Sequence, residues 1–288
     1  MKRAIFVLGA QRSGTSVTSH VLSELSVQFG DRDRFIQFDH NPIFFELPWV
    51  NELNNQIVKA IGHQYIDFFL PLEADFMAPK IQPQIQAIQA DIHRLIQNEW
   101  HDQVVRTSFP FKPIAAADSQ DFIIGIKDPR ISLTFPIWEP VLLARGYSIQ
   151  VVQPFRSPAG FLHSNQKLFH QWEGWTIDRH LHFWLQLNLA AVYFTRRYPL
   201  HLLNYDRLMQ FSLEEVVQLV TALSLNVSLA EKAAAVVQTE HYHHGDRSKD
   251  VQTDIPWVNE VYLKLCNKTI TANDYLNYRQ QMRSMSLV

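Results

Sequence analysis

Hydrophobic residues along the chain fall into short continuous runs separated by stretches with helical spacing. The short runs have the length and composition of strands that are buried on both faces of a parallel sheet. They occupy residues 4–8, 122–126, 148–153 and 200–204. Apolar residues with helical spacing occupy 82–99, 131–145, 158–171 and 178–197, and then 213–225 and 228–238.

Strands and helices that alternate in this way form a parallel sheet with helices on both faces. We therefore predict an α/β fold, with residues 1–288 as a single domain. The segment 62–113 interrupts the alternation with aromatic and proline-rich sequence, including Phe68-Phe69-Leu70-Pro71 and Phe109-Pro110-Phe111. We interpret it as a helical insertion that lies over the ligand site, on the side of an acceptor molecule.

The segment between the first strand and the first helix, residues 9–16, reads Gly-Ala-Gln-Arg-Ser-Gly-Thr-Ser. A strand, a glycine-flanked turn and a helix start together direct backbone N–H groups toward an anion. The spacing is that of a Walker A loop, whose lysine contacts the β- and γ-phosphates and whose Ser/Thr binds Mg²⁺. Here Thr15 takes the lysine position and Arg12 lies inside the loop. The loop predicts phosphate binding through side-chain charge and backbone, without a metal.

Charged residues also follow the other predicted strands. Lys127 follows 122–126, Arg156 follows 148–153, and Tyr205-Asp206-Arg207 follows 200–204. Because ligands of open parallel sheets bind beyond the carboxyl ends of the strands, these cations are expected beside the phosphate loop. Basic residues are also common in exposed loops, which is the alternative interpretation of any single one. Together they favour a polyanion site.

Arg156 opens a second predicted anion site. Ser157 can cap a helix that has Pro158 at its first position. Positions 157, 161 and 164 share one helical face, so Ser164 can face Arg156. Arginine binds phosphate through a planar fork, and a serine hydroxyl adds one hydrogen bond. A nucleotide with phosphates on both its 5′ and 3′ positions would use both sites.

These motifs as a set resemble the sulfotransferase superfamily, and in particular its bacterial members. The similarity rests on Gln-Arg-Ser-Gly-Thr-Ser after the opening strand, on Lys-Asp-Pro-Arg from residue 127, and on Arg156-Ser157-Pro158 with Ser164 eight residues after the arginine. It covers about residues 3–210. Further landmarks that resemble the family are Asn41-Pro42 with Glu46, Asn54, Trp184 and Asn204-Tyr205-Asp206-Arg207-Leu208.

The resemblance implies a three-layer α/β fold of the P-loop NTPase type, and the donor 3′-phosphoadenosine-5′-phosphosulfate (PAPS), with the bisphosphate PAP as product. It implies that the loop residues bind the 5′-phosphosulfate and that Arg156 and Ser164 bind the 3′-phosphate. No Mg²⁺ is required by this superfamily. The loop residues concerned are Gln11, Arg12, Ser13, Gly14, Thr15 and Ser16.

Sulfuryl transfer requires removal of the acceptor proton and stabilisation of charge on the moving and departing groups. Arg12 and Lys127 are the predicted catalytic cations, because they match positions at which family members keep basic residues. Lys127 can alternatively form a structural pair with Asp128. Arg130 is predicted to form an ion pair or to anchor its loop.

Glu46 is the first candidate for the general base, since some relatives use a glutamate after the first helix. Partial burial beside Phe44 and Phe45 would suit this role. His40, whose ordinary pKa lies closer to neutrality, is the alternative base. A non-catalytic interpretation of Glu46 is a solvated residue in the first turn of a helix that starts near Pro42.

The late segment His241-Tyr242-His243-His244 is predicted to be a polar surface loop, because neither a cysteine nor a suitable carboxylate pattern completes a metal site. The following Gly245-Asp246-Arg247 could close over the nucleotide, which makes Arg247 a further candidate for the 3′-phosphate.

Composition further limits the partners and the cellular location that we expect for the protein. The formal net charge of −2 gives no argument for nucleic acid, and Cys266, as the one cysteine, excludes an internal disulfide. No stretch approaches the roughly 18 apolar residues of a membrane span, so we expect a cytoplasmic protein. The resulting prediction is a PAPS-dependent sulfotransferase acting on a hydroxyl or amine of a small-molecule, carbohydrate or lipid acceptor. The alternatives are a P-loop kinase or other phosphotransferase, and a non-catalytic nucleotide-binding protein.

Overall fold

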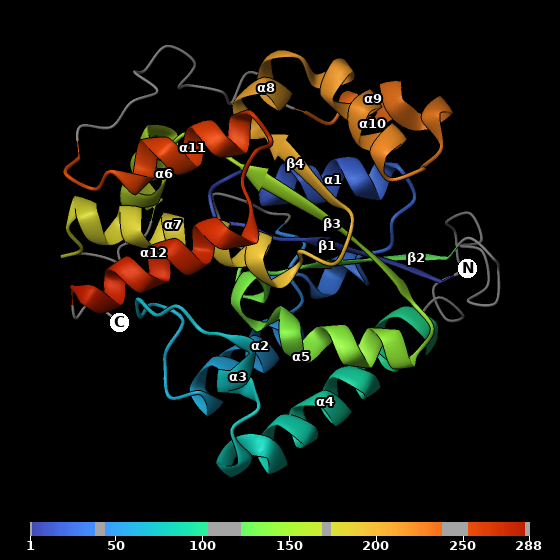
Figure 1. Cartoon of the computed structure of the whole chain (residues 1–288). Helices are drawn as coiled ribbons and strands as arrows, with labels where there is room; N and C mark the ends of the chain where they lie inside the picture. The colour runs from blue at the N-terminus through green and yellow to red at the C-terminus, as the bar shows by residue number, and fades with distance from the viewer. Residues whose placement is uncertain (1, 38–43, 103–121, 169–173, 238–252, 286–288) are drawn as a thin grey trace.

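The computed structural model describes residues 2–37, 44–102, 122–168, 174–237 and 253–285. Four parallel strands form the central sheet in the order β2-β1-β3-β4 (Figure 1). They are β1 (Arg3–Val7), β2 (Ile123–Lys127), β3 (Ser148–Phe155) and β4 (Leu200–Asn204). Each lies within two residues of its predicted run. The parallel α/β prediction is therefore confirmed.

Helices cover both faces of this sheet. On one side lie α1 (Thr15–Glu24), α9 (Ser212–Ala222) and α10 (Ala230–Ala234), and on the other lie α5 (Ile131–Ala144) and α7 (Ile177–Phe194) (Figure 1). The strands β1, β2 and β3 are buried over most of their length because helices cover both faces of the sheet, while the edge strand β4 is partly exposed. For example, the Phe6 ring of β1 packs edge-on against Phe135 of α5.

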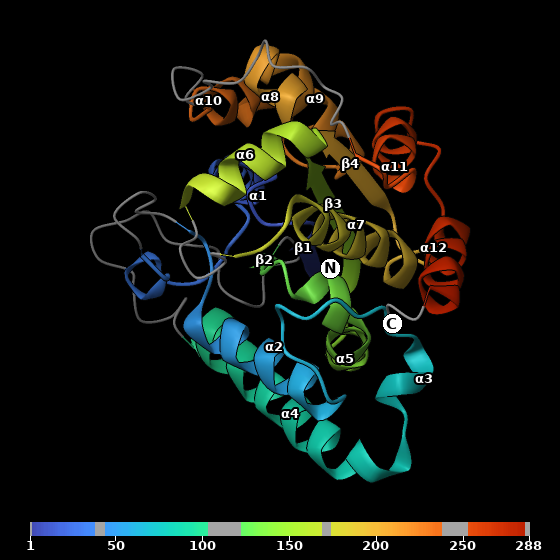
Figure 2. The same cartoon turned by 90° about the vertical axis from the view of Figure 1, so that its left-hand side faces the viewer.

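Further helices pack outside these layers. In the region 44–102, α2 (Pro48–Ala60) and α4 (Gln82–Ile96) run side by side over α5, and α3 (Glu73–Phe76) lies between them in sequence (Figure 2). A π-helical turn, Gln97–Asp102, continues α4. The remaining helices are α6 (Pro158–Leu168), α8 (Tyr205–Gln210), α11 (Trp257–Cys266) and α12 (Ala272–Ser284).

The predicted insertion 62–113 is helical in its described part, through α3 and α4. Helix α4 packs against α2 and α5, while Tyr65, just after α2, reaches the β1–α1 loop. Its position on the acceptor side stays a prediction, and Phe109-Pro110-Phe111 lies outside the described residues. The helix predicted at 228–238 is shorter than expected, because a 3₁₀ turn, Val227–Leu229, replaces its start and α10 ends at Ala234.

Candidate functional site

The loop between β1 and α1 is held in a conformation that only some residues tolerate. Gly9, Arg12 and Gly14 all have positive φ angles, of 104°, 62° and 91°. The backbone N–H of Gly9 donates a hydrogen bond of 2.9 Å to the Oγ of Ser132 on α5. A Cβ atom on Gly14 would lie 2.3 Å from the ring of Tyr205. Left-handed backbone at a non-glycine residue such as Arg12 is uncommon and concentrates at functional loops.

Helix α1 begins immediately after this loop, at Thr15, and its N-terminus is suited to an anion. Its first turn contains no acidic residue, and its N-cap residue, Gly14, has no side chain that could cap the free N–H groups. These N–H groups and the helix dipole favour a negative charge at this end. The Oγ of Ser16 donates to the carbonyl oxygen of Phe44 at 3.5 Å.

A cavity of about 170 Å³ opens at this end of α1 and collects most of the predicted site residues. It lies beyond the carboxyl ends of β1, β2 and β3, where the sheet topology brings them to one edge. Those residues are Gln11, Arg12, Gly14, Thr15, Ser16, Glu46, Lys127, Arg156 and Ser164, joined by Val17, Phe44 and Tyr205.

Three predicted site residues are not part of this cavity lining. The side chain of Ser13 is fully buried, and its Oγ has no hydrogen-bond partner in the described part of the chain. His40 and Arg247 lie outside the described residues. The roles predicted for these residues stay predictions.

Two arginines, Arg12 and Arg156, converge in the cavity. The Nε of Arg12 donates to the Oγ of Ser164 at 3.0 Å, so Ser164 links the phosphate loop to α6. Arg156 stacks over Tyr205 at 4.6 Å, and its buried Nε lacks a hydrogen-bond partner among the described residues, with the Asp206 carboxylate 3.9 Å away. Burial and the charge of Arg156 lower the pKa of Arg12. Two cations that repel each other in a buried cavity create a strong preference for an anion.

The caps at the start of α6 follow the sequence prediction. The Oγ of Ser157 accepts a hydrogen bond from the N–H of Gly160, and Pro158 is the first helical residue. Ser157 also donates its backbone N–H to Asp206 at 3.3 Å, which ties the start of α6 to α8. These contacts fix the direction of the Arg156 side chain.

Lys127 pairs with Glu46 and not with Asp128, so the alternative Lys127–Asp128 pair is wrong. The Nζ of Lys127 contacts the Glu46 carboxylate and donates to the carbonyl oxygen of Phe44 at 2.9 Å. Asp128 instead pairs with Arg130, which also donates to Asn55 at 2.9 Å. The expectation that Arg130 forms an ion pair or anchors its loop is confirmed for the ion pair.

Glu46 is buried, with 5% of its surface exposed, and it lies outside any helix, before α2 begins at Pro48. The alternative picture of a solvated Glu46 in the first turn of a helix is therefore wrong. Burial raises the pKa of the Glu46 carboxyl above its ordinary value, although the Lys127 charge opposes this shift. The result is a carboxylate held against an ammonium group inside the cavity.

Sequence reasoning missed several groups that shape this site. Phe44 supplies a backbone carbonyl to Ser16 and Lys127, and its ring lies 4.9 Å from the Lys127 ammonium. Tyr65 donates to the Oε1 of Gln11 at 2.8 Å, and Ser132 holds Gly9. Because every residue has a backbone carbonyl, the sequence contains no signal that predicts the contacts of the Phe44 carbonyl. Tyr65 and Ser132 come from distant segments without a spacing that links them to the loop.

Comparison with solved structures places the fold among sulfotransferase domains. The sulfotransferase domain from the curacin biosynthetic pathway aligns with a TM-score of 0.50 and 16% sequence identity, over 94% of this chain and 98% of that one. The sulfotransferase domain from the Synechococcus PCC 7002 olefin synthase gives a TM-score of 0.40 and 16% identity, over 80% of this chain and 75% of that one. The first likeness shows that this chain has the fold of a sulfotransferase domain, as its motifs predicted.

Neither a protein-family model nor a curated protein matches the sequence. Within the described ranges, no helix is both long and apolar enough to cross a membrane. The same ranges contain no group of three or more His, Cys, Asp or Glu side chains placed to hold a metal ion.

Proposed function

We propose that this protein is a sulfotransferase that moves a sulfuryl group from PAPS to a hydroxyl or amine of a small-molecule, carbohydrate or lipid acceptor. The observation that carries the proposal is the convergence of Arg12 and Arg156 on one buried cavity beside a phosphate loop. A nucleotide with separate 5′ and 3′ phosphates would satisfy both arginines at once.

The described residues fit such a donor. The N-terminus of α1 and the loop suit its 5′ end, where Arg12 lies over the glycine turn. Arg156 offers a buried Nε without a hydrogen-bond partner in the described structure, which a 3′-phosphate would engage, and Ser164 lies on the same cavity wall. When bound, PAPS supplies the sulfuryl group and a stable bisphosphate leaving group.

Glu46 and Lys127 are the proposed catalytic pair. The Glu46 carboxylate takes the proton of the acceptor hydroxyl while the acceptor oxygen bonds to sulfur and the sulfur–oxygen bond to the 5′-phosphate breaks. Lys127 and Arg12 stabilise the negative charge that passes to the leaving phosphate. Lys127 already contacts Glu46, so the two proposed catalytic groups lie together in the donor cavity.

The competing function is ATP-dependent phosphoryl transfer. Thr15 at the Walker lysine position weighs against it, and Lys127, the lysine in the cavity, is engaged by Glu46 and Phe44. A kinase loop would instead keep a lysine on the β- and γ-phosphates.

Thermal shift with PAP, ADP and ATP plus Mg²⁺ tests the proposal. PAP and ADP carry the same phosphates in different positions, so ADP is a matched control for the 3′-phosphate. A ligand at 100 times its Kd stabilises the folded state by about 2.7 kcal/mol, and we expect PAP to give the larger shift at equal concentration. Arg156→Ala should remove the difference between PAP and ADP, while Arg207→Ala, at an exposed arginine on α8, should preserve it.

A larger shift with ATP plus Mg²⁺ than with PAP would contradict the sulfotransferase proposal and favour a phosphotransferase. Labelled PAPS incubated with acceptor panels then separates an enzyme from a non-catalytic nucleotide-binding protein. Transfer of label to any acceptor supports the enzyme. Tight PAP binding without transfer to any class of acceptor favours the binding protein.

A further inference from the structure

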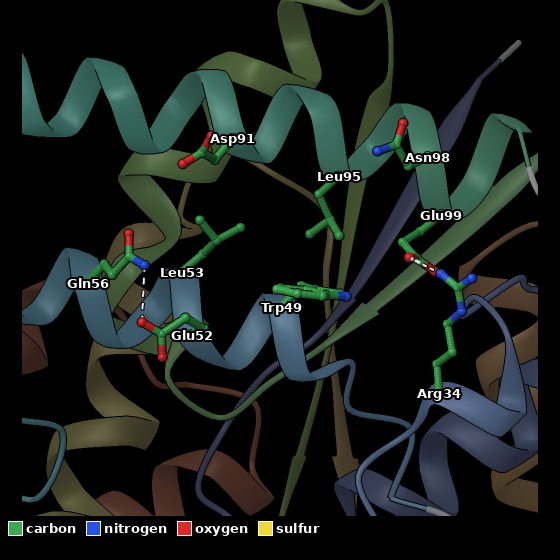
Figure 3. Close-up of a pocket in the computed structure, with 9 residues that line it drawn as sticks. All are labelled: Arg34, Trp49, Glu52, Leu53, Gln56, Asp91, Leu95, Asn98 and Glu99. Atoms are coloured by element: carbon green, nitrogen blue, oxygen red, sulfur yellow. Dashed lines mark hydrogen bonds and ion pairs between the residues drawn. The ribbon is translucent and has the colours of Figure 1, made fainter.

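A second cavity, of about 490 Å³, lies between α2 and α4 (Figure 3). Its floor is apolar and consists of Leu53 of α2 and Leu95 of α4, each 7% exposed. The Trp49 ring lies at one end of this floor, in the first turn of α2. We call this cavity the α2/α4 groove.

Trp49 is 60% exposed, although it is a large aromatic residue on a helix that packs against two others. Positions 49, 53 and 56 share one helical face, so the indole and Leu53 line the same side of the groove. Large aromatic side chains are usually buried when they serve the core. The solvent-exposed indole of Trp49, which lies above an apolar floor, therefore indicates a ligand-binding surface.

Both rims of the groove carry carboxylates and carboxamides. On α2, the Nε2 of Gln56 donates to Glu52 at 3.0 Å. Across the groove, Asp91 pairs with Arg94, and Asn98 lies one turn beyond Leu95 (Figure 3). Most of the negative charge is thus balanced, and the rims offer hydrogen-bonding groups more than net charge.

Glu99 supplies a second, independent sign of a ligand. Its side chain is 4% exposed and lines the groove, and its Oε1 accepts from Arg34 at 2.7 Å. Its other oxygen, Oε2, is buried without a hydrogen-bond partner among the residues that the structure describes. A buried acceptor left unpaired is costly, so a ligand that donates a hydrogen bond here gains affinity.

The lining of the groove suits a ligand that has an apolar face to pack on Trp49, several hydroxyl groups to donate to the rims and Glu99, and no net charge. A hydrocarbon would leave Glu99 unsatisfied. The Glu52 carboxylate would repel an anion. A cation would have to compete with the arginines that already pair with Asp91 and Glu99. We propose that the α2/α4 groove binds a neutral sugar unit of an oligosaccharide, with its C–H face on Trp49 and its hydroxyls on the rims.

The groove lies close to the proposed catalytic centre along the chain. Glu46 lines the donor cavity and Trp49 lines the groove, so their Cα atoms are at most about 11 Å apart. This step rests on the proposed function: the groove holds one unit of the acceptor while a hydroxyl of another unit reaches Glu46. The proposal thus selects carbohydrate among the possible acceptors.

Calorimetric titration of the full chain with cellohexaose, maltohexaose, mannohexaose and N-acetylchitohexaose tests the groove directly. We expect at least one hexaose to bind, and Trp49→Ala to weaken it by about tenfold or more, with Trp49→Phe between the two. Phe211→Ala, at another exposed aromatic residue outside the groove, should leave affinity unchanged.

The titration needs no donor, so its failure is distinct from a failure of the PAP thermal shift. Absence of binding by every hexaose, or equal affinity in Trp49→Ala, overturns the groove proposal and leaves the donor site intact. Binding of spermine that Glu52→Gln abolishes would show a cation site instead. Light scattering that finds a dimer in the wild type and a monomer in Trp49→Ala would show a contact between copies of the chain.

Discussion

The Glu46 carboxyl and the Lys127 ammonium form a buried ion pair at the edge of the donor cavity. The free energy of such a pair is balanced between desolvation and attraction, so burial of this kind is weak evidence for stability. It is better evidence for function, since groups with shifted pKa values concentrate at active sites. For Glu46 the net pKa shift is upward, with burial as its largest cause.

This shift predicts the pH dependence of the transfer reaction. A base must be ionised, and a carboxyl with a raised pKa loses its proton only at a pH above the ordinary glutamate range. We therefore expect kcat/KM to rise with pH, with a midpoint above the ordinary glutamate range. Glu46→Gln should lower kcat by about 100-fold or more and remove this limb, as measured with labelled PAPS.

Glu231→Gln, on the exposed surface of α10, is the control and should leave the profile unchanged. Full activity in Glu46→Gln would remove Glu46 from the role of base and leave His40 as the candidate.

At the scale of single residues, the sequence predicted where the cations of the site lie, but it did not predict which carboxylate Lys127 contacts. Arg12, Lys127 and Arg156 were expected at one edge because parallel strands bring their carboxyl ends together, and they line one cavity. The Glu46–Lys127 pair joins positions 81 residues apart, and nothing in the local pattern of either segment indicates it. A sequence neighbour, Asp128, was the more obvious partner, but Arg130 occupies it.

The geometry of the β1–α1 loop predicts that a methyl group added at Gly14 would disturb the contacts of the loop with Tyr205. Gly14 has a φ of 91°, and a Cβ there would lie 2.3 Å from Tyr205, which stacks under Arg156. Gly14→Ala should therefore displace Tyr205 and with it Arg156, and so weaken PAP binding by about tenfold or more.

Gly62→Ala is the matched control, because Gly62 has a φ of 86° but a methyl group added there would meet nothing within 4 Å. It should cost about 1–2 kcal/mol in the free energy of unfolding and leave PAP affinity unchanged. Urea unfolding and calorimetry measure both quantities. Equal PAP affinity in the wild type and Gly14→Ala would show that the Tyr205 contact does not position Arg156.

Elements themselves were predictable to different degrees. The four strands were found because fully buried parallel strands are continuous apolar runs. Helix α2 was not among the predicted helices, although Pro48 at its start and the spacing of Val50, Leu53 and Ile57 are helical signals. A helix start was considered only near Pro42, which lies outside the described residues.

Across the whole molecule, Tyr65 connects the outer α2–α4 region to the β1–α1 loop. Tyr65 follows α2, stacks on Arg130 at 4.3 Å and donates its hydroxyl to Gln11 at 2.8 Å. Gln11 lines the donor cavity, and its Nε2 has no hydrogen-bond partner within the described ranges. We expect this contact to couple the position of the outer helices to the loop that is proposed to bind PAPS.

Tyr65→Phe keeps the ring and removes this hydrogen bond. We expect the free energy of unfolding to fall by about 1 kcal/mol, and PAP affinity to fall by about three- to tenfold because Gln11 loses its anchor. Tyr193→Phe is the control, since it removes a hydroxyl bonded to Glu73 at 2.6 Å, outside the donor cavity. It should lower stability by a similar amount and leave PAP affinity unchanged. If both variants bind PAP like the wild type, the outer helices support the fold alone, and their coupling to the donor loop must be abandoned.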